Sequence, residues 1–207
     1  MRARASPTRH EGEIDSPHHR WDTPLPVTPF NRGVLQGVLA SPGIQPLLQV
    51  FFGPHERVRL VEHSSLLSKR GALAQRFHID VESSPEQLSH SRMLSMGLAL
   101  QDVEPDMGPL QVLKRGNHRH DLYSLVVPKG TVYVWDNHRA MHRGGANSSD
   151  KPRAIYYWTL LPVGVPVPEG STESLLEEEK ERHVFDLASG RWVGDEGGPV
   201  PAVAARD

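Results

Sequence analysis

Short apolar runs separated by turn residues constrain the fold of this chain more than any other feature. Between 58 and 161, runs such as SMGLALQDV (95–103), TVYVW (131–135) and AIYYWTLL (154–161) are rich in alternating apolar, β-branched or aromatic residues. Side chains alternate between the two faces of a strand, so each run can bury one face. Eighteen glycines and eighteen prolines suit many turns better than long helices. The pattern predicts a mainly β, antiparallel sandwich or barrel of the jelly-roll type.

The remaining segments are expected to flank this β domain. Residues 1–30 are polar, proline-bearing and aperiodic, which predicts a flexible or edge N-terminal arm. Residues 31–52 should form two short helices, because a Ser-Pro-Gly sequence interrupts them. The chain is therefore expected to carry one main domain at 31–162 and a C-terminal extension at 163–207. Within the extension, the acidic stretch 171–182 is expected to be helical.

Composition and charge exclude several classes of partner. The net charge is -2, so nothing indicates an electrostatic interaction with nucleic acid or an anionic membrane. No apolar run approaches the roughly 20 residues that span a bilayer, and the N-terminus lacks the apolar region of a signal peptide. The chain has no cysteine, which excludes thiolate metal ligands and cysteine nucleophiles. We therefore expect a cytoplasmic protein with neither nucleic-acid nor membrane partners, and its oligomeric state is not readable from the sequence.

A metal site is predicted from two separate segments. His78 and Asp80 lie two residues apart in the alternating segment 74–81, so on a strand both side chains project from the same face. His142 follows the apolar run 131–135 and is the third candidate. Two imidazoles and one carboxylate form the facial set that is typical of non-haem Fe(II) oxygenases and leaves coordination positions open. An HxD motif by itself is weak in a chain with twelve histidines, because a surface His beside a solvated Asp gives the same letters.

Other histidines keep alternatives open. His118 and His120 form an HxH, which suggests a cupin-like metal site, but no Glu follows at the spacing that a cupin needs. His138 and His142 are four residues apart, as two zinc ligands on a helix would be. The β-branched and aromatic run before them favours a strand, and this weakens the zinc interpretation.

Three segments in order resemble a known family. QRFHID, GPLQVLKRGNH and HRGGANSSDKPR resemble the phytanoyl-CoA dioxygenase family of Fe(II)- and 2-oxoglutarate-dependent oxygenases. In that family an HxD precedes a GPL…PGSH-like turn and an HxGxxNxSxxxR sequence. The first and third elements match closely, whereas the middle one has Lys-Arg-Gly-Asn-His at 114–118 in place of Pro-Gly-Ser-His. The resemblance runs from about residue 31 to residue 161.

The resemblance implies a double-stranded β-helix (jelly roll) with a few flanking short helices. In it, His78, Asp80 and His142 would be the catalytic iron ligands. Arg153 would pair with the distal carboxylate of 2-oxoglutarate, for which its planar guanidinium is suited. Gln75, three residues before the first histidine, is a further candidate at the co-substrate pocket, with a solvent-facing strand residue as an equally good interpretation.

The implied reaction is the oxidation of a C–H bond of a small-molecule substrate by O2, with release of succinate and CO2; ascorbate is open as an accessory reductant. Asp80 favours hydroxylation or another oxidation, because related halogenases have a small residue there. Gly144 is a departure, since some members have at this position a Ser that assists the co-substrate carboxylate. The N-terminal region is also short for the family. The alternative function is a non-catalytic jelly-roll module that binds a small molecule, and the substrate itself is not indicated.

Overall fold

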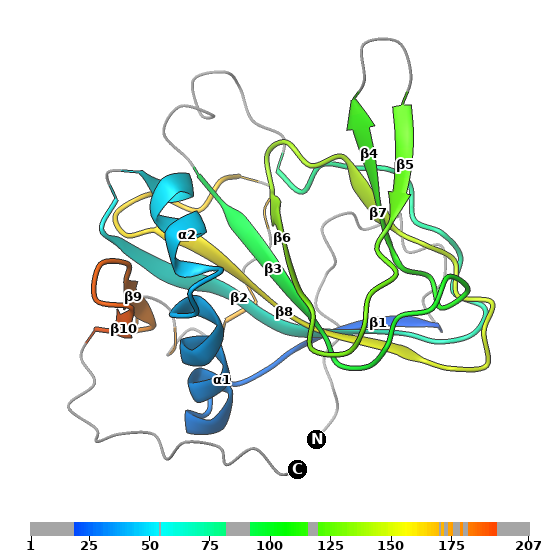
Figure 1. Ribbon diagram of the computed structural model, residues 1–207, viewed down its shortest axis with the longest axis horizontal. Helices are drawn as coiled ribbons and strands as arrows, with labels where there is room; N and C mark the ends of the chain where they lie inside the picture. The colour runs from blue at the N-terminus through cyan, green and yellow to red at the C-terminus, as the bar shows by residue number, and fades with distance from the viewer. Residues whose placement is uncertain are drawn as a thin grey trace.

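Two antiparallel sheets form the body of the protein (Figure 1). The computed structural model describes residues 19–53, 55–81, 92–115, 120–169, 171, 174–175, 179 and 182–193. The large, seven-stranded sheet has the order β10-β9-β2-β8-β3-β6, and β1 also pairs with β2. Its strands are β1 (Arg20–Pro24), β2 (Arg57–Ser68), β3 (Leu94–Ala99), β6 (Val132–Asp136), β8 (Arg153–Pro162), β9 (Val184–Asp186) and β10 (Arg191–Trp192). The small sheet has the order β5-β4-β7, with β4 (Leu110–Arg115), β5 (His120–Ser124) and β7 (His142–Gly144). The predicted mainly β class is confirmed.

Two helices cover one face of the large sheet (Figure 1). Helix α1 (Pro29–Leu39) starts with a proline, and the Thr28 hydroxyl accepts a hydrogen bond from the Asn31 amide at its N-terminus. Helix α2 (Gln45–Phe52) follows after a short turn. Each helix buries an apolar stripe against the sheet, so the two expected short helices are confirmed and their covered face is the main core.

Strand β8 shows how differently the two faces of the large sheet are built. Tyr156, Trp158 and Leu160 point to the helix-covered face and belong to the main apolar cluster. The alternate residues of the same strand, including Arg153 and Thr159, point to the opposite face. We call the helix-covered side the outer face and the opposite side the inner face.

The segment that carries the HxD motif is not the regular strand expected at 74–81. It makes only isolated bridges, Ala72 with Asn147 and His78 with His142. The backbone amide of Gln75 donates to the carbonyl of Gly144. Gln75 bonds to Gly144 and His78 bonds to His142, so three residue steps on this segment match only two steps on β7. The segment therefore contains one extra residue, which interrupts the ladder. The prediction of a regular strand was wrong, although the segment still runs beside β7.

Both ends of the chain add to the large sheet. At the N-terminal end, β1 pairs with Ser64–Ser68 of β2, while residues 1–18 lie outside the described residues. At the C-terminal end, β9 pairs with Arg57–Arg59 of β2, a contact that the sequence did not predict. Most of the expected helix at 171–182 lies outside the described residues, and Ser174, which is described, is not helical. Among the helices of the described part, none is long and apolar enough to cross a membrane.

Candidate metal and co-substrate site

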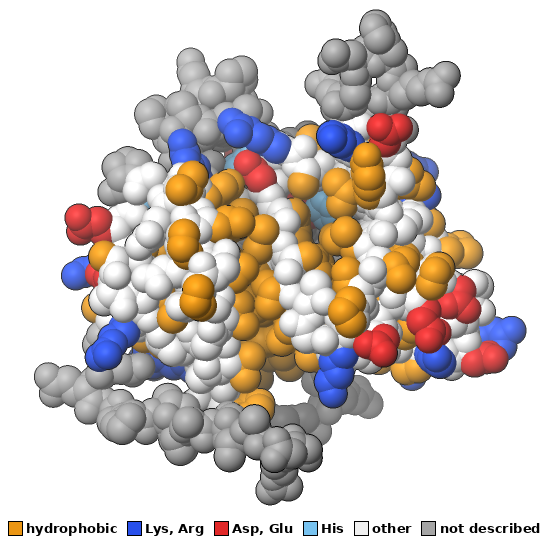
Figure 2. Space-filling model, viewed as in Figure 1, with side chains coloured by type: hydrophobic (Ala, Val, Ile, Leu, Met, Phe, Trp, Pro, Cys, Tyr) orange, Lys and Arg blue, Asp and Glu red, His pale blue; other side chains and the backbone are white. Residues whose placement is uncertain are grey.

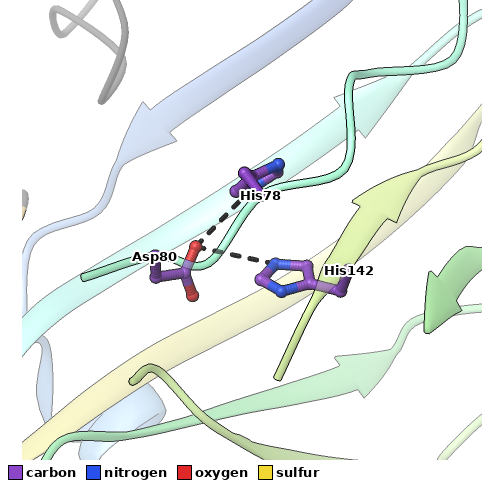
Figure 3. Close-up of side chains that lie close together, drawn as sticks. All are labelled: His78, Asp80 and His142. Atoms are coloured by element: carbon purple, nitrogen blue, oxygen red, sulfur yellow. Dashed lines mark ion pairs between the residues drawn. The ribbon is translucent and has the colours of Figure 1, made fainter. Parts of the chain in front are cut away.

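The three predicted metal ligands come together. Oδ1 of Asp80 lies 3.6 Å from Nε2 of His78 and 3.6 Å from Nε2 of His142 (Figure 3). The ligand atoms of all three residues lie within 4.8 Å of one another, and within the described residues no other group of this kind occurs. Figure 2 shows histidine atoms between the large sheet and the strands β4 and β5. Two nitrogens and one oxygen at these distances could hold one divalent metal ion from one side.

Backbone contacts fix the orientation of both imidazoles. The backbone amides of His78 and His142 each donate to the other's carbonyl at 2.9 Å, which holds the two residues side by side. Nδ1 of His78 lies 2.9 Å from the carbonyl of Arg76, and Nδ1 of His142 lies 2.9 Å from the carbonyl of Ala140. A carbonyl can only accept, so both Nδ1 atoms carry the proton, and each Nε2 keeps its lone pair for a metal.

Trp135, on β6, holds the carboxylate ligand from behind. Its indole N–H donates to Oδ2 of Asp80 at 2.8 Å, and this leaves Oδ1 facing the two imidazoles. The indole ring also lies 5.8 Å from the His142 ring, between centroids. No pattern in the sequence shows which acceptor the Trp135 indole will reach. This contact is therefore a feature of the candidate site that sequence reasoning missed.

Arg153 shares the inner face with the candidate metal ligands. Trp135, which contacts Asp80, pairs with Ser95 of β3, and Ser95 pairs with Thr159 of β8. Residues directly opposite each other in an antiparallel sheet have side chains on the same face. Arg153 lies six residues from Thr159 along β8, an even number, so its side chain also points to the inner face.

The environment of Arg153 indicates a site for an anion. The residue is 1% exposed, and its Nε and Nη2 are buried without a hydrogen-bond partner. Burial lowers the pKa of Arg153, and the nearby Tyr133 opposes this shift. Burial also raises the pKa of Tyr133 to about 12, although Arg153 acts against it, so the phenol stays protonated. A buried guanidinium without a partner is unfavourable, and a bound carboxylate would satisfy it.

Gln75 supports β7, the strand that begins at His142. Its Oε1 accepts a hydrogen bond from the amide of Gly144 at 2.8 Å. A Cβ at Gly144 would lie 2.7 Å from that Oε1 and 3.4 Å from Nη2 of Arg20. Nη2 of Arg20 also donates to the carbonyls of Leu73 and Gly145, at 2.9 Å each. These contacts place Gln75 as a support of β7, and its role in binding the co-substrate stays a prediction.

The remaining polar residues singled out in the sequence do not belong to the three-residue metal group. Asn147 donates to the carbonyls of Ser68 and Lys151, so it fixes the turn before Arg153. His138 lies outside the three-residue metal group. The predicted alternative at His118 lies outside the described residues.

Comparison with known proteins supplies a family and a fold. The family model for phytanoyl-CoA dioxygenase (PhyH) matches residues 10–155. Comparison with curated proteins finds no match.

Solved structures with a similar fold include EctD from S. alaskensis in its apoform (21% identity, TM-score 0.51), which matches over 75% of this chain and 61% of EctD. HygX from Streptomyces hygroscopicus, with nickel, 2-oxoglutarate and hygromycin B bound, has 14% identity and a TM-score of 0.51, with 71% of each chain covered. AviO1 from Streptomyces viridochromogenes Tue57 has 18% identity and a TM-score of 0.48. This chain spans only 62% of AviO1 and 61% of EctD. The likeness to EctD and HygX indicates a shared fold.

Proposed function

This chain belongs to the phytanoyl-CoA dioxygenase (PhyH) family, and we propose that it is an Fe(II)- and 2-oxoglutarate-dependent dioxygenase. Its substrate would be a small molecule with an oxidisable C–H bond, and residues 31–162 would carry the activity. One O2 oxidises the substrate and 2-oxoglutarate together, which gives the hydroxylated product, succinate and CO2. The observation that carries the proposal is that His78, Asp80 and His142 converge on the same face as the buried, unpartnered Arg153.

The donor set fits iron. Two neutral imidazoles and one carboxylate oxygen from His78, Asp80 and His142 would occupy three coordination positions and leave three open. When bound there, iron would supply the redox chemistry with O2. Trp135 would keep the second oxygen of Asp80 engaged, so that the carboxylate binds through one oxygen only.

The buried arginine fits the co-substrate. Two oxygens of a carboxylate can accept from the guanidinium of Arg153 in parallel, and burial strengthens this ion pair because water is excluded. Tyr133, protonated and close enough to Arg153 to affect its pKa, adds no negative charge that would compete. Ascorbate as an accessory reductant and a cytoplasmic location both remain predictions.

An anaerobic titration tests this function. Fe(II) and 2-oxoglutarate together should give a weak metal-to-ligand absorption band in the visible, and admission of O2 should produce succinate. Arg153→Ala should keep iron but weaken 2-oxoglutarate binding, and Arg153→Lys should lie between, because it keeps the charge and loses the planar fork. Arg57→Ala, which removes an arginine 57% exposed in its side chain, is the control and should change neither.

A non-catalytic binding module is the competing function. It would be signalled by the loss of a metal ligand or of the arginine, and the chain keeps all four residues. If the wild-type protein gave no visible band and formed no succinate, the enzyme proposal would be wrong. An unchanged 2-oxoglutarate affinity in Arg153→Ala would remove Arg153 from the site but leave the metal assignment in place.

A further inference from the structure

Three polar residues form a row across the inner face, at the level of Arg153. Arg20 of β1 pairs with Ser68 of β2, and Ser68 pairs with Arg153 of β8. Directly opposed residues share a face, so the Ser68 side chain lies on the inner face beside that of Arg153. The irregularity in the β2–β8 ladder falls between Leu60 and Glu62, away from this row, and does not change this assignment.

The Ser68 hydroxyl is buried and has no partner. Ser68 is 0% exposed, and its Oγ makes no hydrogen bond. Its backbone is held in place, because its carbonyl accepts from Nδ2 of Asn147 at 2.9 Å and the residue pairs on both sides within the sheet. Buried polar atoms in native proteins are nearly always hydrogen-bonded, so a fixed orphan hydroxyl beside an orphan guanidinium needs an explanation.

The chemical groups around Arg153 and Ser68 favour a ligand that accepts hydrogen bonds. The free hydrogen-bonding positions at Arg153 are all donors, and the hydroxyl of Ser68 can donate as well. The acidic residue in the next row of β1, Asp22, already accepts from the Tyr157 hydroxyl at 2.6 Å. The next inner-face residues along the two strands, Leu66 and Ile155, are apolar and pair with each other. A carboxylate that continues into a short hydrocarbon chain matches this order of polar and apolar groups.

Strand β7 cannot supply this hydroxyl. Position 144, two residues after His142, is a glycine whose side-chain space is filled by Gln75 and Arg20. Strand β2, by contrast, offers a hydroxyl directly opposite Arg153. We propose that Ser68 donates a hydrogen bond to the distal carboxylate of 2-oxoglutarate and forms that subsite together with Arg153. This inference rests on the proposed function.

The test compares two serines on the same strand. Ser68→Ala removes the proposed donor, and Ser64→Ala is the matched control. Ser64 also lies on the inner face, is 0% exposed and has an unpartnered hydroxyl, but it pairs with Tyr157 instead of Arg153. Anaerobic titration of the Fe(II) protein, followed by the visible band and by calorimetry, should show a roughly ten-fold weaker affinity for 2-oxoglutarate in Ser68→Ala. Iron affinity should be unchanged in both variants, and Ser64→Ala should keep its affinity for 2-oxoglutarate.

A second keto acid locates the effect. Pyruvate has the keto-acid end but no distal carboxylate, so Ser68→Ala should bind it as the wild type does. Equal losses for pyruvate and 2-oxoglutarate, or no loss for either, would overturn the assignment of Ser68. Ser68→Cys keeps nearly the same shape but has a weaker hydrogen-bond donor, so its affinity for 2-oxoglutarate should be intermediate. This variant replaces Ser68→Ala in the test if the alanine variant does not fold. A wild-type protein that binds iron but no 2-oxoglutarate would contradict the proposed function itself, a result distinct from a difference between the two serine variants.

Discussion

The two faces of the large sheet are made by the same strands but are built from different chemistry. On the outer face, Trp158 and Leu160 of β8 pack with the helices and are 0% exposed. On the inner face, the neighbouring residues of β8 include Arg153 and Thr159, which are equally buried but polar. The apolar face gains free energy from burial alone, whereas the polar face needs partners for its buried groups. The difference indicates that the outer face stabilises the fold and the inner face is shaped for a ligand.

The inner face contains both satisfied and unsatisfied polar groups. Near the metal ligands, Ser95 and Glu62 both contact the hydroxyl of Thr159, in a chain of short hydrogen bonds. At the other end, Arg153 and Ser68 lack partners. The Ser64 hydroxyl of β2 is also buried without a partner, but of these two serines it is Ser68 that lies directly opposite Arg153.

The largest expected effect is on the inner face, from His142→Ala. Removal of one of three metal ligands should abolish iron binding, because the remaining His78 and Asp80 leave the ion held from one segment only. Iron per protein chain, measured after equilibrium dialysis, checks this. His138→Ala, four residues earlier and outside the metal group, should bind iron as the wild type does. Full iron occupancy in His142→Ala would contradict the metal site.

Trp158→Ala tests the outer face and should act on stability instead. The side chain is fully buried among the helices and β3, and truncation of a buried aromatic residue typically costs about 3–5 kcal/mol of unfolding free energy. Denaturant unfolding measures the loss. Under conditions where the variant is folded, its iron affinity should equal that of the wild type. A large change in iron affinity with little loss of stability would show that the two faces are not separate in function.

The sequence could group the candidate metal ligands because their spacing carries information. His78 and Asp80 are close in the chain, and His142 and Arg153 lie in one motif, so a family pattern can find them. These side chains come together although residues 74–81 do not form a regular strand, because an isolated bridge pairs His78 with His142.

Other features depend on register, which the sequence does not reveal. Whether Ser64, Ser65 or Ser68 points inward depends on which residue of β8 each one meets, and on the irregularity after Leu60. The indole of Trp135 reaches Asp80 only because β6 pairs with β3 in one particular register. Strands β9 and β10 have three and two residues, too few for a periodic pattern, and β9 exists because the edge of β2 offers it a partner.

Trp135→Phe tests whether the hydrogen bond from the Trp135 indole to Asp80 affects iron binding. Phenylalanine fills most of the same space but cannot donate to Asp80, so the carboxylate would be free to rotate or to bind through both oxygens. Loss of such a supporting contact typically lowers metal affinity by about 10–100-fold. An Fe(II) titration against a competing chelator measures this. Tyr133→Phe, whose ring stacks on Trp135 at 5.9 Å, is the control and should leave iron affinity unchanged. If both variants matched the wild type, the indole contact would be structural only.

The smallest expected effect belongs to the outer face and depends on pH. Burial lowers the pKa of His63 below its usual 6.5, although a hydrogen bond to the Leu25 carbonyl opposes the shift. Below about pH 6.5 the unfolded chain takes up a proton that the folded protein resists, so this residue makes stability fall as the pH decreases through that window. His63→Gln should flatten the dependence of unfolding free energy on pH between 6.5 and 5, by at most about 1.4 kcal/mol per pH unit, the value for one proton. Equal slopes in the wild type and His63→Gln would mean that His63 titrates alike in the folded and unfolded states. The loss of stability at low pH would then come from other residues, such as the buried His183, whose pKa burial also lowers.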